Sequence, residues 1–198
     1  MNTAILLSGG MDSIALAYWK RPELAITIDY GQASAAGEIR ASQQICQELG
    51  IVHDVISVDC HKLGSGDLAQ SSPLSIAPVP EWWPFRNQLL ITLASMRAVT
   101  LGIKDLLFGA VQTDGCHVDG QKHFFDNIDR LVNSQEGEVR ICAPAISMTT
   151  AELVVKSGID MILLSWAHSC HVAEYACGRC RGCNKHRQVM MELGHEPY

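Results

Sequence analysis

The sequence predicts an α/β fold with a doubly wound parallel sheet. In the first half of the chain, short apolar runs typical of strands alternate with segments that have the length and pattern of helices. Parallel strands need crossover connections of this kind, and the helices then cover both faces of the sheet. The chain has 198 residues, 47% of them hydrophobic and 18% charged, so residues 1–198 suit a single domain with a full core.

The expected elements follow from local signals. Gly50 stands at a C-cap position, and Thr149 with Glu152 has the spacing of a capping box at the start of a late helix. The expected strands are Thr3–Leu7, Leu24–Asp29, Ile51–Val58, Asp105–Ala110, Val139–Ala143 and Met161–Leu164. The expected helices are Asp12–Lys20, Ala33–Leu49, Phe85–Leu101, Phe124–Asn133 and Thr149–Ser157.

The segment His61–Pro84 is rich in Gly, Ser and Pro and has little periodicity. A connection of this length without regular structure is either an active-site flap or a disordered tether. Trp82 and Trp83 favour a flap or a partner surface, since a solvated tether seldom keeps two tryptophans.

Composition excludes several classes of protein. The net charge of −6 argues against a general nucleic-acid or membrane surface. No apolar run is long enough to span a bilayer, and the N-terminus lacks a basic region before its apolar stretch. We expect a cytoplasmic protein with no direct nucleic-acid or membrane partner.

The stretch Ile5–Ser13, with the sequence ILLSGGMDS, indicates an anion-binding loop. An apolar strand runs into a Gly-rich turn and a helix start, where unpaired backbone N–H groups and the helix dipole favour phosphate. Gly9 and Gly10 allow close approach of the backbone, and the hydroxyls of Ser8 and Ser13 add donors. Asp12 either caps the helix or helps to hold magnesium. The loop lacks the Walker pattern, and an ordinary turn is the alternative.

The C-terminal cysteines predict a zinc knuckle at residues 165–187. Four of the eight cysteines crowd there with short spacings, whereas the other four are scattered. A closed set of four thiolates leaves no open coordination position, so the zinc would be structural. A redox CxxC, an iron–sulfur cluster and four unrelated cysteines are the alternatives. The expected ligands are Cys170, Cys177, Cys180 and Cys183.

Several motifs together resemble the 7-cyano-7-deazaguanine synthase (QueC) family of PP-loop ATP pyrophosphatases, and the resemblance runs from Thr3 to Arg187. Besides the loop and the cysteines, the motifs are IDYGQ at Ile28–Gln32, PFRN at Pro84–Asn87 and GAVQTD at Gly109–Asp114. The resemblance implies a PP-loop fold, ATP and Mg²⁺ dependence, structural Zn²⁺ and frequently a homodimer. It also implies adenylation of the carboxylate of 7-carboxy-7-deazaguanine, release of pyrophosphate, and reaction with ammonia to give first the amide and then the nitrile.

The resemblance and the chemistry suggest roles for individual residues. Ser8, Asp12, Ser13 and Arg86 would be catalytic, because amides and cations hold a departing pyrophosphate where its charge develops. Arg86, Asn87, Asp114 and Asp119 would bind the substrate, the two carboxylates by reading the guanine-like edge. The expected ATP-binding residues are Leu7, Ser8, Gly9, Gly10, Met11, Asp12, Ser13, Asp29, Tyr30 and Gly31.

The chain also departs from the family pattern. The segment Cys116–Phe124 replaces a family segment that helps to bind the deazaguanine, and a family lysine after Ala143-Pro144 is absent. The first alternative is therefore a QueC-like paralogue of antiviral defence that passes the activated deazaguanine to a protein amine. The second alternative is an inactive nucleotide-binding zinc protein.

Overall fold

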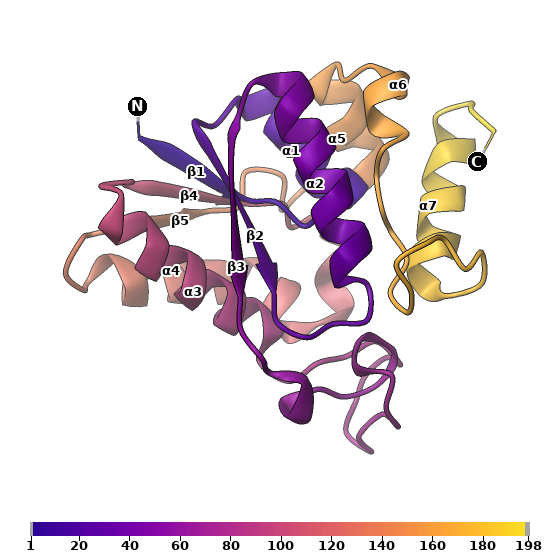
Figure 1. Ribbon diagram of the computed structural model, residues 1–198, viewed down its shortest axis with the longest axis horizontal. Helices are drawn as coiled ribbons and strands as arrows, with labels where there is room; N and C mark the ends of the chain where they lie inside the picture. Colours follow the sequence, from indigo (N-terminus) through magenta and orange to yellow (C-terminus); the bar gives the residue numbers. More distant parts are fainter. Residues whose placement is uncertain (1, 197–198) are drawn as a thin grey trace.

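The computed structural model describes residues 2–196, and its centre is a parallel sheet of five strands in the order β3-β2-β1-β4-β5 (Figure 1). All four neighbouring pairs are parallel, so the predicted sheet type is confirmed. The central strand β1 pairs Ile5 with Ala25 of β2 on one side and with Leu107 of β4 on the other. The strands are β1 (Thr3–Leu6), β2 (Leu24–Asp29), β3 (Val52–Ser57), β4 (Asp105–Phe108) and β5 (Arg140–Cys142).

Helices pack on both faces of the sheet, as a doubly wound fold requires. On one face, Ile14 of α1, Ile45 of α2 and Leu153 of α5 belong to one buried cluster. On the other face, Ile91 of α3 and Phe125 of α4 belong to a second. The helices on the two faces are α1 (Met11–Lys20), α2 (Ala35–Leu49) and α5 (Thr150–Ser157), and α3 (Arg86–Thr100) and α4 (Lys122–Asn133).

The strand order reverses between β1 and β4, and this position determines where a ligand fits. The chain winds from β1 through β2 to β3 on one side, then crosses to β4 on the other side of β1. In open parallel sheets, ligands bind outside the carboxyl ends of the strands at such a switch point. Ser8 follows β1 and Gly109 follows β4 at this point, and a Cβ on Gly109 would lie 3.0 Å from Ser13 Cα.

The C-terminal part differs from the sequence-based expectation. Met161–Leu164 was expected to be a strand; it is the short helix α6, because the carboxylate of Asp160 accepts a hydrogen bond from Ile162 N at 2.7 Å and starts a helical turn. Helix α7 (Arg181–Glu192) is an element that the sequence pattern missed, since its composition is strongly polar. In Figure 1 α7 stands beside the sheet, with the cysteine-containing loop at its lower end.

Other local predictions are confirmed with small changes of boundary. Gly50 ends α2 in the left-handed conformation, and Thr149 forms the expected capping box with Glu152. The connection between β3 and α3 contains two 3-10 turns, η1 (His61–Leu63) and η2 (Asp67–Ala69), and lies beyond the carboxyl ends of the strands (Figure 1). Within residues 2–196, no helix is long and apolar enough to cross a bilayer.

Candidate active site at the carboxyl edge of the sheet

The loop after β1 presents an open helix N-terminus. Gly10 is the N-cap of α1, and in the described part of the chain no side chain caps the first amides of the helix. Asp12 therefore does not cap the helix, contrary to one sequence-based option. Gly9 has φ +72°, and a Cβ there would lie 2.6 Å from the carbonyl oxygen of Glu38, so the turn depends on glycine. The loop thus offers free backbone donors to an anion.

Two serine hydroxyls line this loop. Ser8 Oγ lies 3.2 Å from Ser13 Oγ, and the Ser13 hydroxyl donates to the carbonyl of Gly10 at 3.0 Å. Ser13 is buried, whereas Ser8 is exposed. The Ser8 hydroxyl is consequently the more accessible of the two for a ligand.

A cavity of about 290 Å³ opens at the switch point and collects most of the predicted residues. Its lining joins the loop after β1 to the ends of β2 and β4, the start of α3 and the C-terminal knuckle. The predicted residues on its wall are Leu7, Ser8, Gly10, Met11, Asp12, Ser13, Tyr30, Arg86, Asn87, Asp114 and Cys170. The predicted residues that do not line it are Gly9, Asp29, Gly31, Asp119, Cys177, Cys180 and Cys183.

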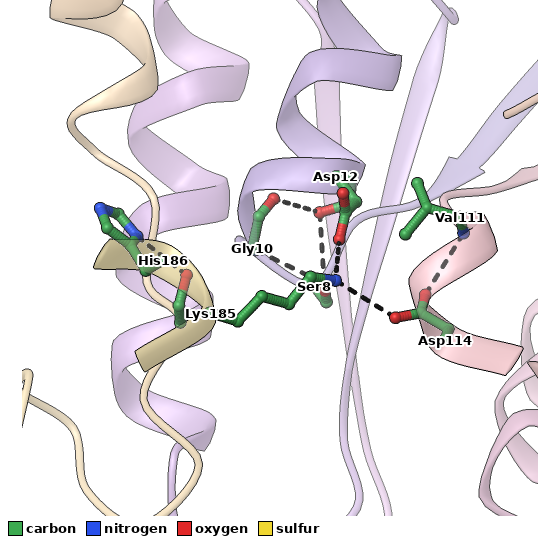
Figure 2. A network of polar contacts seen from close by, with 9 residues as sticks. Ser8, Gly10, Asp12, Val111, Asp114, Lys185 and His186 are labelled. Carbon is green, nitrogen blue, oxygen red and sulfur yellow. Dashed lines mark hydrogen bonds and ion pairs between the residues drawn. The ribbon is translucent and has the colours of Figure 1, made fainter. Parts of the chain in front are cut away.

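Lys185 of α7 bridges two of the predicted carboxylates (Figure 2). Its Nζ lies 3.0 Å from Asp12 Oδ2 and 3.2 Å from Asp114 Oδ1. Burial raises the pKa of Asp12, and the Lys185 cation opposes that rise. Asp114 also accepts a hydrogen bond from Val111 N through Oδ2 at 3.3 Å, so both of its oxygens have partners. A cation is thereby built into the site next to the anion-binding loop.

Arg86 and Asn87, at the start of α3, also line the cavity. Burial opposes the charge of Arg86, but Tyr30 and Asp119 raise its pKa above the ordinary value, so the guanidinium is cationic. Asn87 donates from its backbone N to Asp119 Oδ2 at 3.2 Å and from Nδ2 to Asp119 O at 2.9 Å. Asp119 therefore orients Asn87 from behind the cavity wall, and Arg86 is the wall's planar donor group.

The four C-terminal cysteines form one cluster. Their sulfurs all lie within 4.8 Å of one another, and both the Cys177–Cys183 and the Cys170–Cys180 Sγ distances are 3.9 Å. A tetrahedron of thiolates about 2.3 Å from a zinc ion has edges of about 3.8 Å, so the donor set can hold one metal ion. The backbone N–H of Arg179 lowers the pKa of Cys177 to about 6, which favours the thiolate.

The knuckle packs directly against the loop after β1 and against the connection His61–Pro84, which is called the flap from here on. His168 N donates to the carbonyl oxygen of Gly9 at 2.8 Å. From the flap, Gln70 Nε2 donates to Val172 O at 3.2 Å, and Glu81 forms an ion pair with Arg181 at 3.3 Å. The segment that carries the four cysteines is therefore one wall of the cavity, which neither motif predicted by itself.

Sequence reasoning missed four charged residues on the cavity wall. Glu38 is engaged, since its Oε1 accepts from Ser34 Oγ at 2.6 Å and its Oε2 from Gln32 Nε2 at 2.9 Å. Of the other three, one lies in the connection between β3 and α3, where nothing local marks it, and two lie in α7. The spacing of Arg181 and Lys185 by one helical turn was the available signal, once α7 is recognised as a helix. The four are Glu38, Glu81, Arg181 and Lys185.

Solved structures with the same fold include two enzymes that match nearly all of this chain. The U34-tRNA thiolase NcsA from Methanococcus maripaludis, with its [4Fe-4S] cluster, is 16% identical with a TM-score of 0.55, and the match covers 96% of this chain and 65% of the thiolase. The NMN synthetase from Francisella tularensis is 14% identical with a TM-score of 0.51, and the match covers 98% of this chain and 78% of the synthetase. At these identities the likeness concerns the fold.

Sequence comparisons are more specific. Residues 2–194 match the family described as "Queuosine biosynthesis protein QueC". The 7-cyano-7-deazaguanine synthase of Chlorobaculum tepidum is 30% identical, with 98% of this chain and 93% of the relative covered. That of Pseudomonas fluorescens is 32% identical, with 92% and 87% covered. With the open loop after β1, the switch-point cavity and the four-cysteine knuckle in place, the chain belongs to the QueC family.

Proposed function

We propose that this protein is an ATP-dependent ligase that adenylates the carboxylate of 7-carboxy-7-deazaguanine and joins it to ammonia. The observation that carries the proposal is the single cavity at the switch point, which joins an open anion-binding loop to a wall with Arg86 and Asn87. Relatives covered over most of their length are named 7-cyano-7-deazaguanine synthase, which supports this substrate.

The residues suit the chemistry of adenylation. A carboxylate oxygen of the substrate attacks the α-phosphorus of ATP, the bond to the β-phosphate oxygen breaks, and pyrophosphate leaves with the electron pair. The amides of Met11–Ser13, at the open N-terminus of α1, and the Lys185 cation would stabilise that developing charge. Ammonia then attacks the acyl carbon, AMP leaves, and a proton is lost to give the amide. The amide oxygen would then attack the α-phosphorus of a second ATP with release of pyrophosphate, and that oxygen would leave with AMP as two protons are lost, which gives the nitrile.

The proposed metals fit the donor sets. The Oδ1 atom of Asp12 is buried and meets no donor in good geometry among residues 2–196, so a hard cation held with the ATP phosphates suits it. Magnesium, when bound, neutralises phosphate charge. For the knuckle, sulfurs 3.9 Å apart favour a single zinc ion, because a cluster spreads its four thiolates over several iron atoms. A cytoplasmic location and a homodimer remain predictions.

The decisive experiment is incubation of the protein with ATP, magnesium and 7-carboxy-7-deazaguanine, with and without ammonium, followed by mass spectrometry. We expect pyrophosphate release that requires the deazaguanine, and an amide or nitrile product that requires ammonium. No pyrophosphate under any of these conditions would favour an inactive nucleotide-binding protein and overturn the proposal.

A protein amine is the second candidate acceptor, and one observation favours it. Phe85 and Val118, the sequence neighbours of the cavity-lining Arg86 and His117, are 76% and 70% exposed. Exposed apolar side chains of this size beside a cavity suit contact with another protein. Pyrophosphate release without any free amide or nitrile, even at high ammonium, would replace ammonia with a protein amine in the proposed reaction.

A further inference from the structure

Glu81 is a cavity-lining carboxylate that the mechanism so far leaves without a role. Both oxygens of Glu38 and both of Asp114 have partners, and Asp119 lies outside the cavity lining. We propose that Glu81 is the specificity residue for the base, and that its free oxygen accepts hydrogen bonds from the N1–H and exocyclic amine of the deazaguanine. This inference rests on the proposed function for the identity of the base.

The side chain of Glu81 is buried, and half of its carboxylate is satisfied. Arg181 Nη1 lies 3.3 Å from Oε1, and the side chain is 5% exposed. The other oxygen, Oε2, is buried and has no hydrogen-bond partner among residues 2–196. An unsatisfied buried oxygen is costly, and a ligand that brings N–H donors into the cavity removes this cost. The unpaired oxygen therefore indicates a ligand with a donor edge.

The main chain holds Glu81 in place. The carbonyl oxygen of Pro80 accepts a hydrogen bond from Asp67 N at 2.9 Å. A Cβ on Gly66 would lie 1.8 Å from that same oxygen, so the close approach of the two chain segments requires glycine at position 66. Two residues further on, the buried Trp83 packs edge-on against Tyr30, with ring centroids 4.9 Å apart. Although it lies in an irregular connection, the carboxylate has a defined position.

The chemistry of the two purine rings makes Glu81 selective. A guanine-type ring presents N1–H and an amine side by side, both donors, which match a carboxylate that only accepts. The adenine of ATP presents N1 as an acceptor beside its amine, and its lone pair opposes a carboxylate. A site built to hydrogen-bond a substrate group rejects analogues that lack it. Glu81 would thus reserve its end of the cavity for the deazaguanine.

Helix α7 contributes one cation to each end of the cavity. Arg181 pairs with Glu81, and Lys185, four residues later, pairs with Asp12 beside the anion-binding loop. One helical turn places these two positions about 6 Å apart along the axis. A substrate whose base meets Glu81 can therefore direct its carboxylate toward the phosphates held near Lys185.

The test is a binding experiment with the full chain. Calorimetry measures the affinity of 7-carboxy-7-deazaguanine and of its analogue without the exocyclic amine, for the wild type and for Glu81→Gln. We expect the wild type to prefer the amine-containing ligand by about tenfold, as for one good hydrogen bond, and Glu81→Gln to lose that preference while it binds a non-hydrolysable ATP analogue normally. Glu174→Gln is the matched control, since Glu174 forms an exposed ion pair with Arg40.

Several outcomes would overturn the proposal. Preserved discrimination in Glu81→Gln would do so, as would its loss in Asp114→Asn alone. Glu81→Asp, which keeps the charge and shortens the reach, provides a second variant if the first does not fold, and it should show reduced preference. The proposed function fails separately, if the wild type releases no pyrophosphate; guanine and hypoxanthine then replace the two ligands, and equal or absent binding of both by the wild type overturns the role of Glu81.

Discussion

Helices α1 and α7 both begin beside the cavity, and they differ in whether a side chain caps their first amides. Helix α1 begins at Gly10, which has no side chain, so the first amides stay free. Helix α7 begins at Cys180, whose sulfur accepts a hydrogen bond from Cys183 N at 3.4 Å, and both residues belong to the four-cysteine cluster. One N-terminus has uncapped amides, and the other is closed by thiolates that could hold a metal.

The comparison shows how a structural element can serve chemistry at a distance. Once α7 is held by the cysteine cluster, its next turn presents Lys185 to Asp12 on α1. The closed N-terminus therefore positions a cation for the open one. Each of the following predictions breaks one side of this arrangement or separates the two.

The largest effect is expected from breaking the closed N-terminus. Cys177→Ser should leave insoluble or unfolded protein, because a structural zinc site contributes on the order of 10 kcal/mol to folding, which is comparable to the whole stability of a domain. Circular dichroism and elemental analysis after exhaustive dialysis measure the fold and the metal, with one zinc expected per wild-type chain. Cys116→Ser, an exposed cysteine outside the cluster, is the control for metal content.

Two results would contradict this prediction. A folded, colourless wild-type preparation without zinc would leave the cluster without a structural metal. Iron and sulfide in stoichiometric amounts would replace zinc with an iron–sulfur cluster.

The second prediction breaks the open N-terminus. Asp12→Ala and Ser13→Ala should each lower the rate of pyrophosphate release roughly a hundredfold, because the first removes the proposed ligand of the cation that neutralises the leaving anion and the second removes a hydroxyl of the loop that would hold it. Both variants should keep a normal circular dichroism spectrum. Ser134→Ala, whose hydroxyl bonds only the carbonyl of Leu131 in the described structure, is the control. Near-normal turnover of both loop variants at saturating ATP would place the active site elsewhere.

The third prediction cuts the link between the two helices. Lys185→Met should reduce kcat/KM for ATP roughly tenfold, less than loss of the loop residues, because the lysine is partly exposed and its charge partly screened. Since Lys185 also pairs with Asp114, the double variant with Asp114→Asn should lose less than the two single effects combined. Additive effects would mean that the cation acts independently of that pair.

The smallest effect, a difference of about 1 kcal/mol between two glycine variants, concerns the packing of the open N-terminus. Gly9→Ala and Gly158→Ala both place a Cβ at positive φ, +72° and +67°, but only the first meets a neighbour, Glu38 O at 2.6 Å. In urea unfolding, Gly158→Ala should cost about 1 kcal/mol from backbone strain alone, and Gly9→Ala about 2 kcal/mol or more. Equal losses would show that the loop can yield around the added methyl group.

Much of the fold could be predicted from local patterns, and the errors have physical causes. The strands and helices of the first half have strong periodicity, and Gly50 and Thr149 end or start helices by their own chemistry. Met161–Leu164 was misread because four apolar residues do not distinguish a helix from a strand, and the cap at Asp160 decides between them. Helix α7 escaped detection because it is polar and starts inside the cysteine motif.

The sequence by itself determined the glycine-rich loop after β1 and the cysteine cluster, because in both the groups concerned are close neighbours in the chain. Ser8–Ser13 needs only a strand, two glycines and a helix start, and three of the four cysteines lie within one short turn region. Local geometry then follows from composition and spacing. Their joint membership of one family was also visible from the motifs.

Only the tertiary structure decided how these parts form one site. Lys185 contacts Asp12, which lies 173 residues earlier in the chain. Arg181, in α7, forms an ion pair with Glu81, which lies in the connection between β3 and α3. No periodicity or spacing encodes such contacts, because they depend on the order of the strands and on the docking of α7 against the sheet edge. The charge of each residue was readable in the sequence, but its partner was determined by packing.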